Sequence, residues 1–500
     1  MEKIEVYKSE NDDAATTTTI ESNLSKGESP SLTLEDIDPK IEARLRRKFD
    51  ARVLSSVTIL YLWAFLTRAN IGNAKVLGLQ DELNLGEDNK MSICMTAFYI
   101  TYVLFEVPVN VLVRKYGPRI VLPLICTICG FLTMCNAFVN NFGSLFAIRF
   151  LIGISQAAIM PGISYALGTF YRRHELITRV GVYASCASVA GAFGGLLAIG
   201  FSEIPAWGIL HSWRNIFFFE GIIMMIISVA MYFVMPDSPG SCTFLTEEER
   251  HIGVLRIQLE QLSAGKKEAI TREHFKTAML NINTWLMGLG LFGSLLSMNS
   301  IALFMPSLLS EFGWNSVVTQ IMTVPPYAFA CIICIGCSIL SDRWHTRGVF
   351  MYAICAPLTI IGFAVLLTVG SIGPRYMAIF FATGGGFTCS PIFVGWSVDN
   401  TAGPTVRSIA CAFIISLGEL AGIVSSWTYL PSEAPEYTTG NQINLAMGAL
   451  VLVCAAACSF YMKWENAQRN NGKRDHVLHG LSQDQIDQLG HKHPQFRFTP

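Results

Sequence analysis

The sequence predicts an all-α membrane protein with twelve transmembrane helices in two six-helix halves. The chain has 500 residues, of which 51% are hydrophobic and only 15% are charged, whereas a typical soluble domain carries about 25% charged residues. The apolar residues also form long blocks, and roughly 20 residues of apolar helix cross the hydrocarbon core of a bilayer. A soluble chain of this length would need more charge to coat its surface.

Twelve apolar blocks are long enough to be spans. They cover residues 53–73, 92–113, 120–140, 145–169, 179–201, 214–235, 283–307, 319–341, 350–370, 375–397, 408–429 and 441–463. The polar stretch between the sixth and seventh blocks contains LTEEERHIGVLRIQLEQL, whose spacing and charge predict a short surface helix. We therefore divide the chain into five parts: a disordered N-terminal tail 1–48, a six-helix half 49–235, a linker 236–281, a second six-helix half 282–464 and a C-terminal tail 465–500.

Basic residues predict the orientation in the membrane. Loops rich in lysine and arginine stay in the cytoplasm, and such residues cluster before the first span, in the turns after spans two, four and eight, and after the last span. The turn between spans eleven and twelve has Glu433 and Glu436 and no basic residue. We expect both termini and the linker to be cytoplasmic, with the plasma membrane as the default location of this multi-pass protein.

The sequence indicates no metal site, cofactor or enzymatic centre. Cysteines spaced C-x-x-C occur at 126–129 and at 331–337, but each run lies in the middle of an apolar block with no further ligand nearby, so we interpret them as small packing residues. None of the nine histidines falls in a predicted span, and a membrane-embedded enzyme would need such groups clustered there. We expect a monomer that contacts lipid and a small solute and binds no nucleic acid.

Two arginines within spans are candidate substrate ligands. A charge in the bilayer costs roughly 2.5–3.5 kcal/mol on insertion scales, so each is a functional hypothesis. Arg68 lies late in span one and Arg149 early in span four. A guanidinium binds a carboxylate through two parallel hydrogen bonds, so two arginines on one cavity would form an anion site. The alternative is that each arginine extends to the interface or pairs with a helix end.

Glu419, in the centre of span eleven, is the candidate proton carrier, because burial and a nearby arginine would shift its pKa in opposite directions. The alternative is a structural hydrogen bond to a neighbouring helix. Trp396, Asn299 and Tyr99 could line a cavity, although ordinary packing explains them as well.

Several stretches resemble the anion:cation symporter family of the major facilitator superfamily, and in particular its fungal allantoate, nicotinate and vitamin permease-like members. They occur in the family's order and cover most of residues 50–465: LTRANIGNAK (66–75), FYITYVLFEVPVNVLVRKYGPR (98–119), RFLIGISQAAIMPG (149–162), SWRNIFFFEG (212–221), MPDSPG (235–240), LTEEER (245–250), TVPPY (323–327), ILSDRWHTRG (339–348) and PEYTTGNQIN (435–444). The resemblance implies proton-driven uptake of a small organic anion through a site between the two halves.

The resemblance also assigns roles to residues. RKYGPR and SDRWHTRG stand at matching places in the two halves and imply gating turns with Arg114, Asp342 and Arg343; Arg114 replaces the more usual Asp. The family commonly has acidic residues where this chain has Thr67 and Gln156. Neither side chain can release a proton, so the two proton sites that the resemblance implies are missing. Both residues remain candidate substrate contacts. Transport is then either a proton-independent facilitation or is coupled through Glu419. Export of a secondary metabolite is the main alternative to uptake, and a non-transporting sensor would need a longer signalling tail.

Overall fold

The computed structural model describes residues 39–263, 272–344, 346–401, 404–478 and 493–500. These residues form helices and connecting segments, with no strand among them and one isolated bridge between Trp207 and Leu210. Eleven of the described helices are long and apolar enough to cross a membrane, and the shorter apolar helix Ile409–Ser425 supplies the twelfth span. The predicted fold class is confirmed, while residues 1–38 of the predicted tail lie outside the described part.

The first six spans follow the predicted blocks closely. Their helices are α3 (Ser55–Ala74), α5 (Lys90–Tyr116), α6 (Pro118–Cys135), α7 (Phe142–Gln156) with α8 (Ile159–Gly168), α9 (Arg173–Ser202) and α10 (Trp213–Val234). The fourth span is broken between α7 and α8, where the apolar block predicts one helix. Pro161 explains the break, because proline offers no N–H and its ring clashes with the carbonyl four residues earlier.

The last six spans are formed in the same manner. Their helices are α13 (Ile282–Ser310), α15 (Val324–Trp344), α16 (Arg347–Phe350) with α17 (Ala356–Thr368), α18 (Ile372–Asp399), α19 (Pro404–Glu419) with α20 (Ala421–Ser425), and α21 (Thr438–Asn470). The eleventh span is interrupted at Leu420, between Gly418 and Gly422. Glycine weakens a helix, and at Gly422 it leaves room for the ring of Tyr99 from α5.

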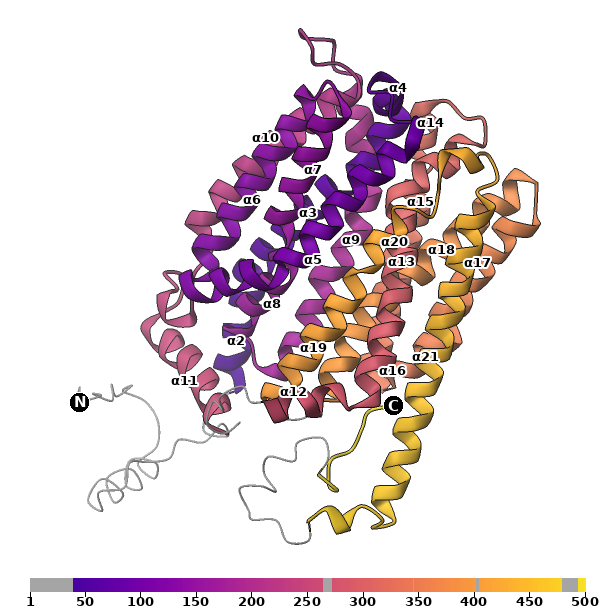
Figure 1. Ribbon diagram of the computed structural model, residues 1–500. Helices are drawn as coiled ribbons and strands as arrows, with labels where there is room; N and C mark the ends of the chain where they lie inside the picture. Colours follow the sequence, from indigo (N-terminus) through magenta and orange to yellow (C-terminus); the bar gives the residue numbers. More distant parts are fainter. Residues whose placement is uncertain (1–38, 264–271, 345, 402–403, 479–492) are drawn as a thin grey trace, which may run out of the picture.

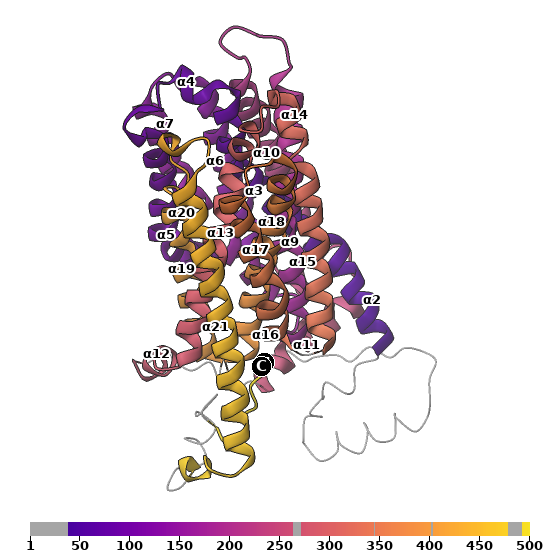
Figure 2. The same cartoon turned by 90° about the vertical axis from the view of Figure 1, so that its right-hand side faces the viewer.

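Besides α4 (Gln80–Glu82), four shorter α-helices flank the long span helices. They are α2 (Pro39–Phe49), α11 (Glu247–Ser263), α12 (Arg272–Met279) and α14 (Ser316–Ile321), and one of them, α14, begins the eighth span. Figure 1 shows α2, α11 and α12 at one end of the bundle and α14 at the other. We call the end at which α3 begins and α21 ends the terminal side and the opposite end the far side. Helix α21 continues past the other spans on the terminal side (Figure 2).

Helix α11 is bound to the first half on the terminal side through charged side chains. Arg256 of α11 is fully buried, and its Nη2 lies 3.2 Å from Glu175 Oε2 and donates to the Phe170 carbonyl at 2.6 Å. Lys48 Nζ lies 2.6 Å from Glu249 Oε2. Burial of Glu249 opposes its ionisation, but hydrogen bonds from Lys48 and Thr246 outweigh that effect and hold the pKa of the carboxyl below its ordinary value. The linker helix is therefore part of the first half.

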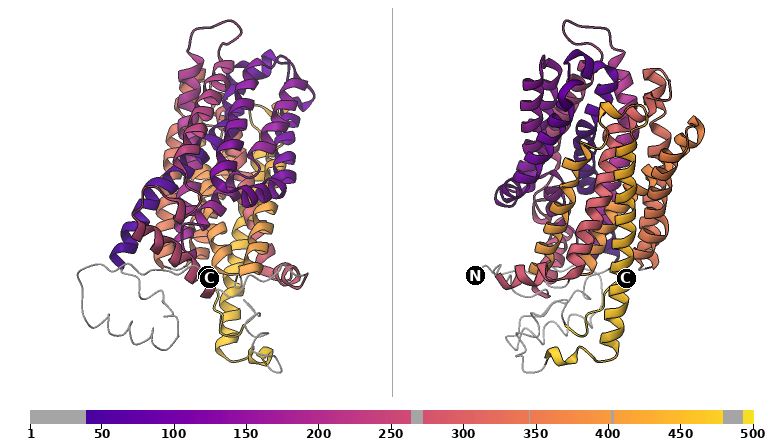
Figure 3. Two further views of the ribbon diagram at one scale, coloured as in Figure 1. Left: turned by 90° about the vertical axis from the view of Figure 1, so that its left-hand side faces the viewer. Right: turned by 45° about the vertical axis from the view of Figure 1, so that its right-hand side comes forward.

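The two halves, which lie side by side in Figure 3, touch one another on the far side. Trp427 Nε1 donates to Thr96 Oγ1 at 2.8 Å, and Lys75 Nζ lies 5.4 Å from the centre of the Phe304 ring. Gly195 lies so close to α14 that a Cβ there would be 2.9 Å from the Gln320 carbonyl oxygen. Close helix approach of this kind requires small residues.

On the terminal side, ion pairs join residues of the same half. Arg179 Nη2 lies 2.9 Å from Asp50 Oδ2 in the first half, and Arg347 Nε lies 2.6 Å from Asp399 Oδ2 in the second. Together with the far-side contacts, this arrangement joins the two halves to one another on the far side.

Candidate functional site

A cavity lies between the two halves, with about 860 Å³ of empty space including its opening to solvent. Helices α3, α5, α7, α8 and α9 of the first half and α13, α18 and α19 of the second supply its walls. Most of the lining residues come from the middle and the terminal-side parts of these helices, whereas Arg68 and Glu419 lie toward the far-side ends of α3 and α19. The cavity therefore extends from a charged roof toward the terminal side.

The roof is an ion pair that joins the halves. Arg68 Nη2 lies 3.3 Å from Glu419 Oε2, across 351 residues of sequence, and the two side chains are 13% and 5% exposed. Arg68 Nε is buried and has no acceptor among the described residues. A guanidinium carries five N–H donors and binds a carboxylate best through two of them. Arg68 therefore keeps donors that a second carboxylate could use.

Three aromatic rings of α5 surround the Arg68 guanidinium. Its Cζ lies 5.5 Å from the ring centre of Phe98, 4.9 Å from that of Tyr99 and 5.3 Å from that of Tyr102. Ring faces attract a cation within about 6 Å, so the rings stabilise the charge at a site with little water. The FYITY stretch indicates this group of rings in the sequence, because residues three or four apart share a helix face. Of the three rings, only Tyr99 is predicted from the sequence to line a cavity.

Thr67 and Gln156 contact one another. The resemblance implies acidic residues at both positions, where this chain has neutral ones. Gln156 Nε2 donates to Thr67 Oγ1 at 3.0 Å and also lies 3.2 Å from the Ala64 carbonyl and 3.2 Å from Cys129 Sγ. Gln156 lines the cavity, whereas Thr67 is 1% exposed and is not among the lining residues. Two neutral side chains thus join α3 to α7 beside the charged roof.

Arg149 is not part of the cavity wall in this conformation. It is 2% exposed, its Cζ lies 5.7 Å from the Phe217 ring of α10, and its Nε and Nη2 have no acceptor among the described residues. The structure therefore does not bring the two predicted arginines onto one cavity, and a substrate contact at Arg149 stays a prediction.

Trp396 and Asn299 also lie outside the cavity wall. Trp396 is fully buried, and its Nε1 donates to the Thr499 carbonyl at 2.7 Å. Asn299 is 2% exposed on α13, next to the lining residue Met298, and its Nδ2 has no acceptor among the described residues. Their predicted substrate contacts remain untested.

The predicted gating residues lie at the terminal-side ends of α5 and α15. Arg114 Cζ lies 5.7 Å from the Tyr165 ring of α8, and Arg343 is exposed. The side chain of Asp342 lies outside the described residues. In the second turn it is Arg347 that forms an ion pair, with Asp399 of α18, a partner that sequence reasoning missed.

Apolar side chains form most of the remaining cavity wall. They include Phe65, Ile159, Met160, Val180, Leu291, Leu295, Met298, Phe387 and Ile415. Tyr61, Tyr102 and Ser390 add hydroxyl groups. A few polar groups in a largely apolar cavity are typical of a small-molecule site, and this cavity could hold an apolar body with a charged group at Arg68.

Comparisons with known proteins match the whole bundle. Residues 57–426 match the Major Facilitator Superfamily. The chain is 32% identical to the MFS-type transporter efuF of Hormonema carpetanum over 89% of this chain and 90% of that protein, and 30% identical to the MFS-type transporter cnsO of Penicillium expansum over 97% and 96%.

Solved structures agree on the fold. The proton:xylose symporter XylE, bound to 6-bromo-6-deoxy-D-glucose, has a TM-score of 0.63 and 15% identity over 81% of this chain and 94% of that one. A bacterial homologue of the human lysosomal transporter Spinster, in an inward-facing and unoccupied conformation, has a TM-score of 0.61 and 14% identity over 84% and 97%.

Proposed function

This chain belongs to the major facilitator superfamily, and on that premise we propose that it is a secondary transporter that carries a small organic anion by alternating access. The observation that carries the proposal is the Arg68–Glu419 ion pair at the roof of the cavity. Arg68 binds the carboxylate of the substrate with the donors that Glu419 leaves free. We further propose that the transporter acts as a monomer.

The charge of the roof favours uptake of a proton together with the anion. The empty roof is neutral, because the Arg68 cation faces the Glu419 carboxylate. A bound carboxylate would leave two anions beside one cation, and two unit charges about 4 Å apart interact by roughly 4 kcal/mol at an effective dielectric constant of about 20. Protonation of Glu419 removes that repulsion and releases Arg68 to the substrate. We therefore propose electroneutral symport of one proton with a monoanion.

The wall of the cavity supports a substrate with an apolar body. Apart from the roof, the polar lining groups are the hydroxyls of Tyr61, Tyr102 and Ser390 and the amide of Gln156. A heavily hydroxylated or dianionic solute would lose hydrogen bonds with water that these few groups cannot replace. We propose an aliphatic or aromatic monocarboxylate.

An uptake panel in cells tests this function. Radiolabelled monocarboxylates with apolar bodies should accumulate when external pH is lowered, and a protonophore should abolish accumulation. Dicarboxylates and sugars serve as controls. Concentrative uptake of a sugar with no response to any carboxylate would contradict the proposal, and indifference to the protonophore would favour a proton-independent facilitator. Loss of preloaded substrate driven by external acid would favour export.

The basic residues on the terminal side support a cytoplasmic location for that side, and we propose the plasma membrane as the membrane that holds the protein. An epitope tag after residue 500 should then be inaccessible to antibody in intact cells and accessible after permeabilisation. A tag in the far-side loop 203–211, between α9 and α10, is the matched control and should be accessible in intact cells. Detection of the tag after residue 500 without permeabilisation would contradict the cytoplasmic location of the terminal side.

A further inference from the structure

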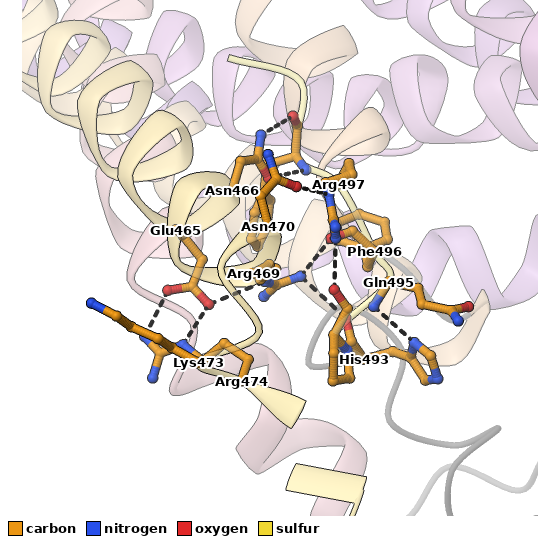
Figure 4. A network of polar contacts seen from close by, with 12 residues as sticks. Glu465, Asn466, Arg469, Asn470, Lys473, Arg474, His493, Gln495, Phe496 and Arg497 are labelled. Carbon is orange, nitrogen blue, oxygen red and sulfur yellow. Dashed lines mark hydrogen bonds and ion pairs between the residues drawn. The ribbon is translucent and has the colours of Figure 1, made fainter. Parts of the chain in front are cut away.

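Residues His493–Pro500 occupy a slot on the terminal side of the second half, next to the end of α21 (Figure 4). Trp396 Nε1 and Asn400 Nδ2 donate to the Thr499 carbonyl at 2.7 and 3.1 Å, and Asn400 Oδ1 accepts from the Thr499 N–H at 2.7 Å. The segment therefore contacts the terminal-side end of α18 through its main chain.

The neighbouring residue is held in the same manner by α21. Asn466 Nδ2 donates to the Phe498 carbonyl at 2.8 Å, and Asn466 Oδ1 accepts from the Phe498 N–H at 2.9 Å. Arg469 Nη1 donates to the Phe496 carbonyl at 2.8 Å. Two asparagines thus form hydrogen bonds with the N–H and carbonyl groups of two consecutive residues. A neighbouring β-strand binds an extended peptide through the same main-chain groups.

Phe498 is the most deeply buried aromatic side chain of the segment. Phe498 is 5% exposed, packs in the apolar cluster that contains Trp396, Phe350 and Met462, and has its ring centre 4.7 Å from Arg469 Cζ. Burial of such an apolar side chain stabilises an interface. The polar contacts therefore bind the main chain, and the Phe498 side chain is the part of the segment that makes binding depend on its sequence.

We propose that residues 493–500 are an internal peptide ligand of this slot, formed by Trp396, Asn400, Asn466 and Arg469, and that their docking favours the conformation closed on the far side. Pro391 lies within α18 and removes a helical hydrogen bond, so the helix can bend there. Phe387, Ser390, Pro391 and Val394 line the cavity, while Trp396 and Asn400 lie beyond Pro391 toward the terminal side. Docking ties this end of α18 to α21, which does not line the cavity.

Closing the terminal side requires the ends of the cavity-lining helices to approach one another. The docked segment opposes that approach at α18, so its release should raise the population that opens on the far side. The proposal rests on the alternating-access part of the proposed function and is independent of the substrate, because hydrogen exchange needs no transport assay.

The test is hydrogen exchange of the purified full-length protein and of a chain lacking residues 493–500. Deletion should speed amide exchange about tenfold at 391–401, because the hydrogen bonds that join Trp396 and Asn400 to the segment are lost. Exchange should also rise in the far-side contacts at 187–195 and 320–327. The synthetic peptide HPQFRFTP should reverse both changes, and a scrambled peptide should not.

Point variants show whether the effect of the deletion comes from loss of the contacts or from misfolding of the shortened chain. Phe498→Ala and Asn400→Ala should reproduce the deletion, and Asn400→Ala should not respond to the peptide. Gln495→Ala is the matched control, because this side chain is exposed on the same segment, and it should leave exchange unchanged. A rise confined to 391–401 would overturn the conformational effect, and unchanged exchange with no response to the peptide would overturn the proposal as a whole.

Discussion

Replacement of Arg68 by glutamine is expected to weaken substrate binding by at least about 100-fold, because each hydrogen bond to a charged group contributes about 1.5–3 kcal/mol and two are lost. The amount of protein at the cell surface reports whether the variant folds. The measurements are radioligand binding to purified protein and uptake in cells, normalised to surface expression. Arg68→Lys should recover little, because a compact ammonium cannot replace the planar fork.

Arg375→Gln is the matched control for Arg68→Gln. Arg375 is a half-buried arginine near the far-side end of α18, outside the cavity wall, with its Cζ 5.7 Å from the Phe312 ring. Its replacement should leave binding within a factor of about two, as for residues away from a binding site. Full transport by Arg68→Gln at normal surface expression would rule out the anion site.

Replacement of Glu419 by glutamine is expected to abolish accumulation against a gradient and to spare exchange of substrate across the membrane. Glutamine resembles a protonated glutamate that cannot lose its proton, so the variant can bind the anion at Arg68 but cannot return a proton. Accumulation should fall to the equilibrium ratio, which is a loss of about tenfold for each pH unit of imposed gradient when one proton is coupled. Proteoliposomes with an imposed pH gradient measure accumulation, and counterflow without a gradient measures exchange.

Glu106→Gln provides the control for Glu419→Gln. Glu106 is a second buried carboxyl at the interface of the halves, where Oε2 accepts from Ser416 Oγ at 3.4 Å, but it does not line the cavity. This variant should retain proton-driven accumulation. If the wild type accumulates substrate with protons and Glu419→Gln does so equally well, Glu419 is structural and the coupling lies elsewhere.

The membrane architecture could be predicted from the sequence because the transfer of a helix into lipid depends on local composition. Each span needs its own apolar block, so the twelve spans could be counted without knowledge of their neighbours. The high cost of charge in lipid likewise singled out Arg68, Arg149 and Glu419 one at a time. The same local reasoning missed the break at Pro161, although proline was visible there, because block length alone decided the span.

Only the tertiary structure decided which of these residues meet. A membrane helix is apolar on every face, so its sequence barely indicates its rotation, which packing against neighbouring helices sets. Arg68 therefore faces Glu419 of the other half, whereas Arg149 is enclosed within the first half beside Phe217. Trp396 could equally face substrate or protein until its neighbours were known, and it binds the main chain at Thr499. The contacts of Trp396 and Arg68 join residues 103 and 351 positions apart. They depend on how the helices pack, and composition and spacing do not encode that packing locally.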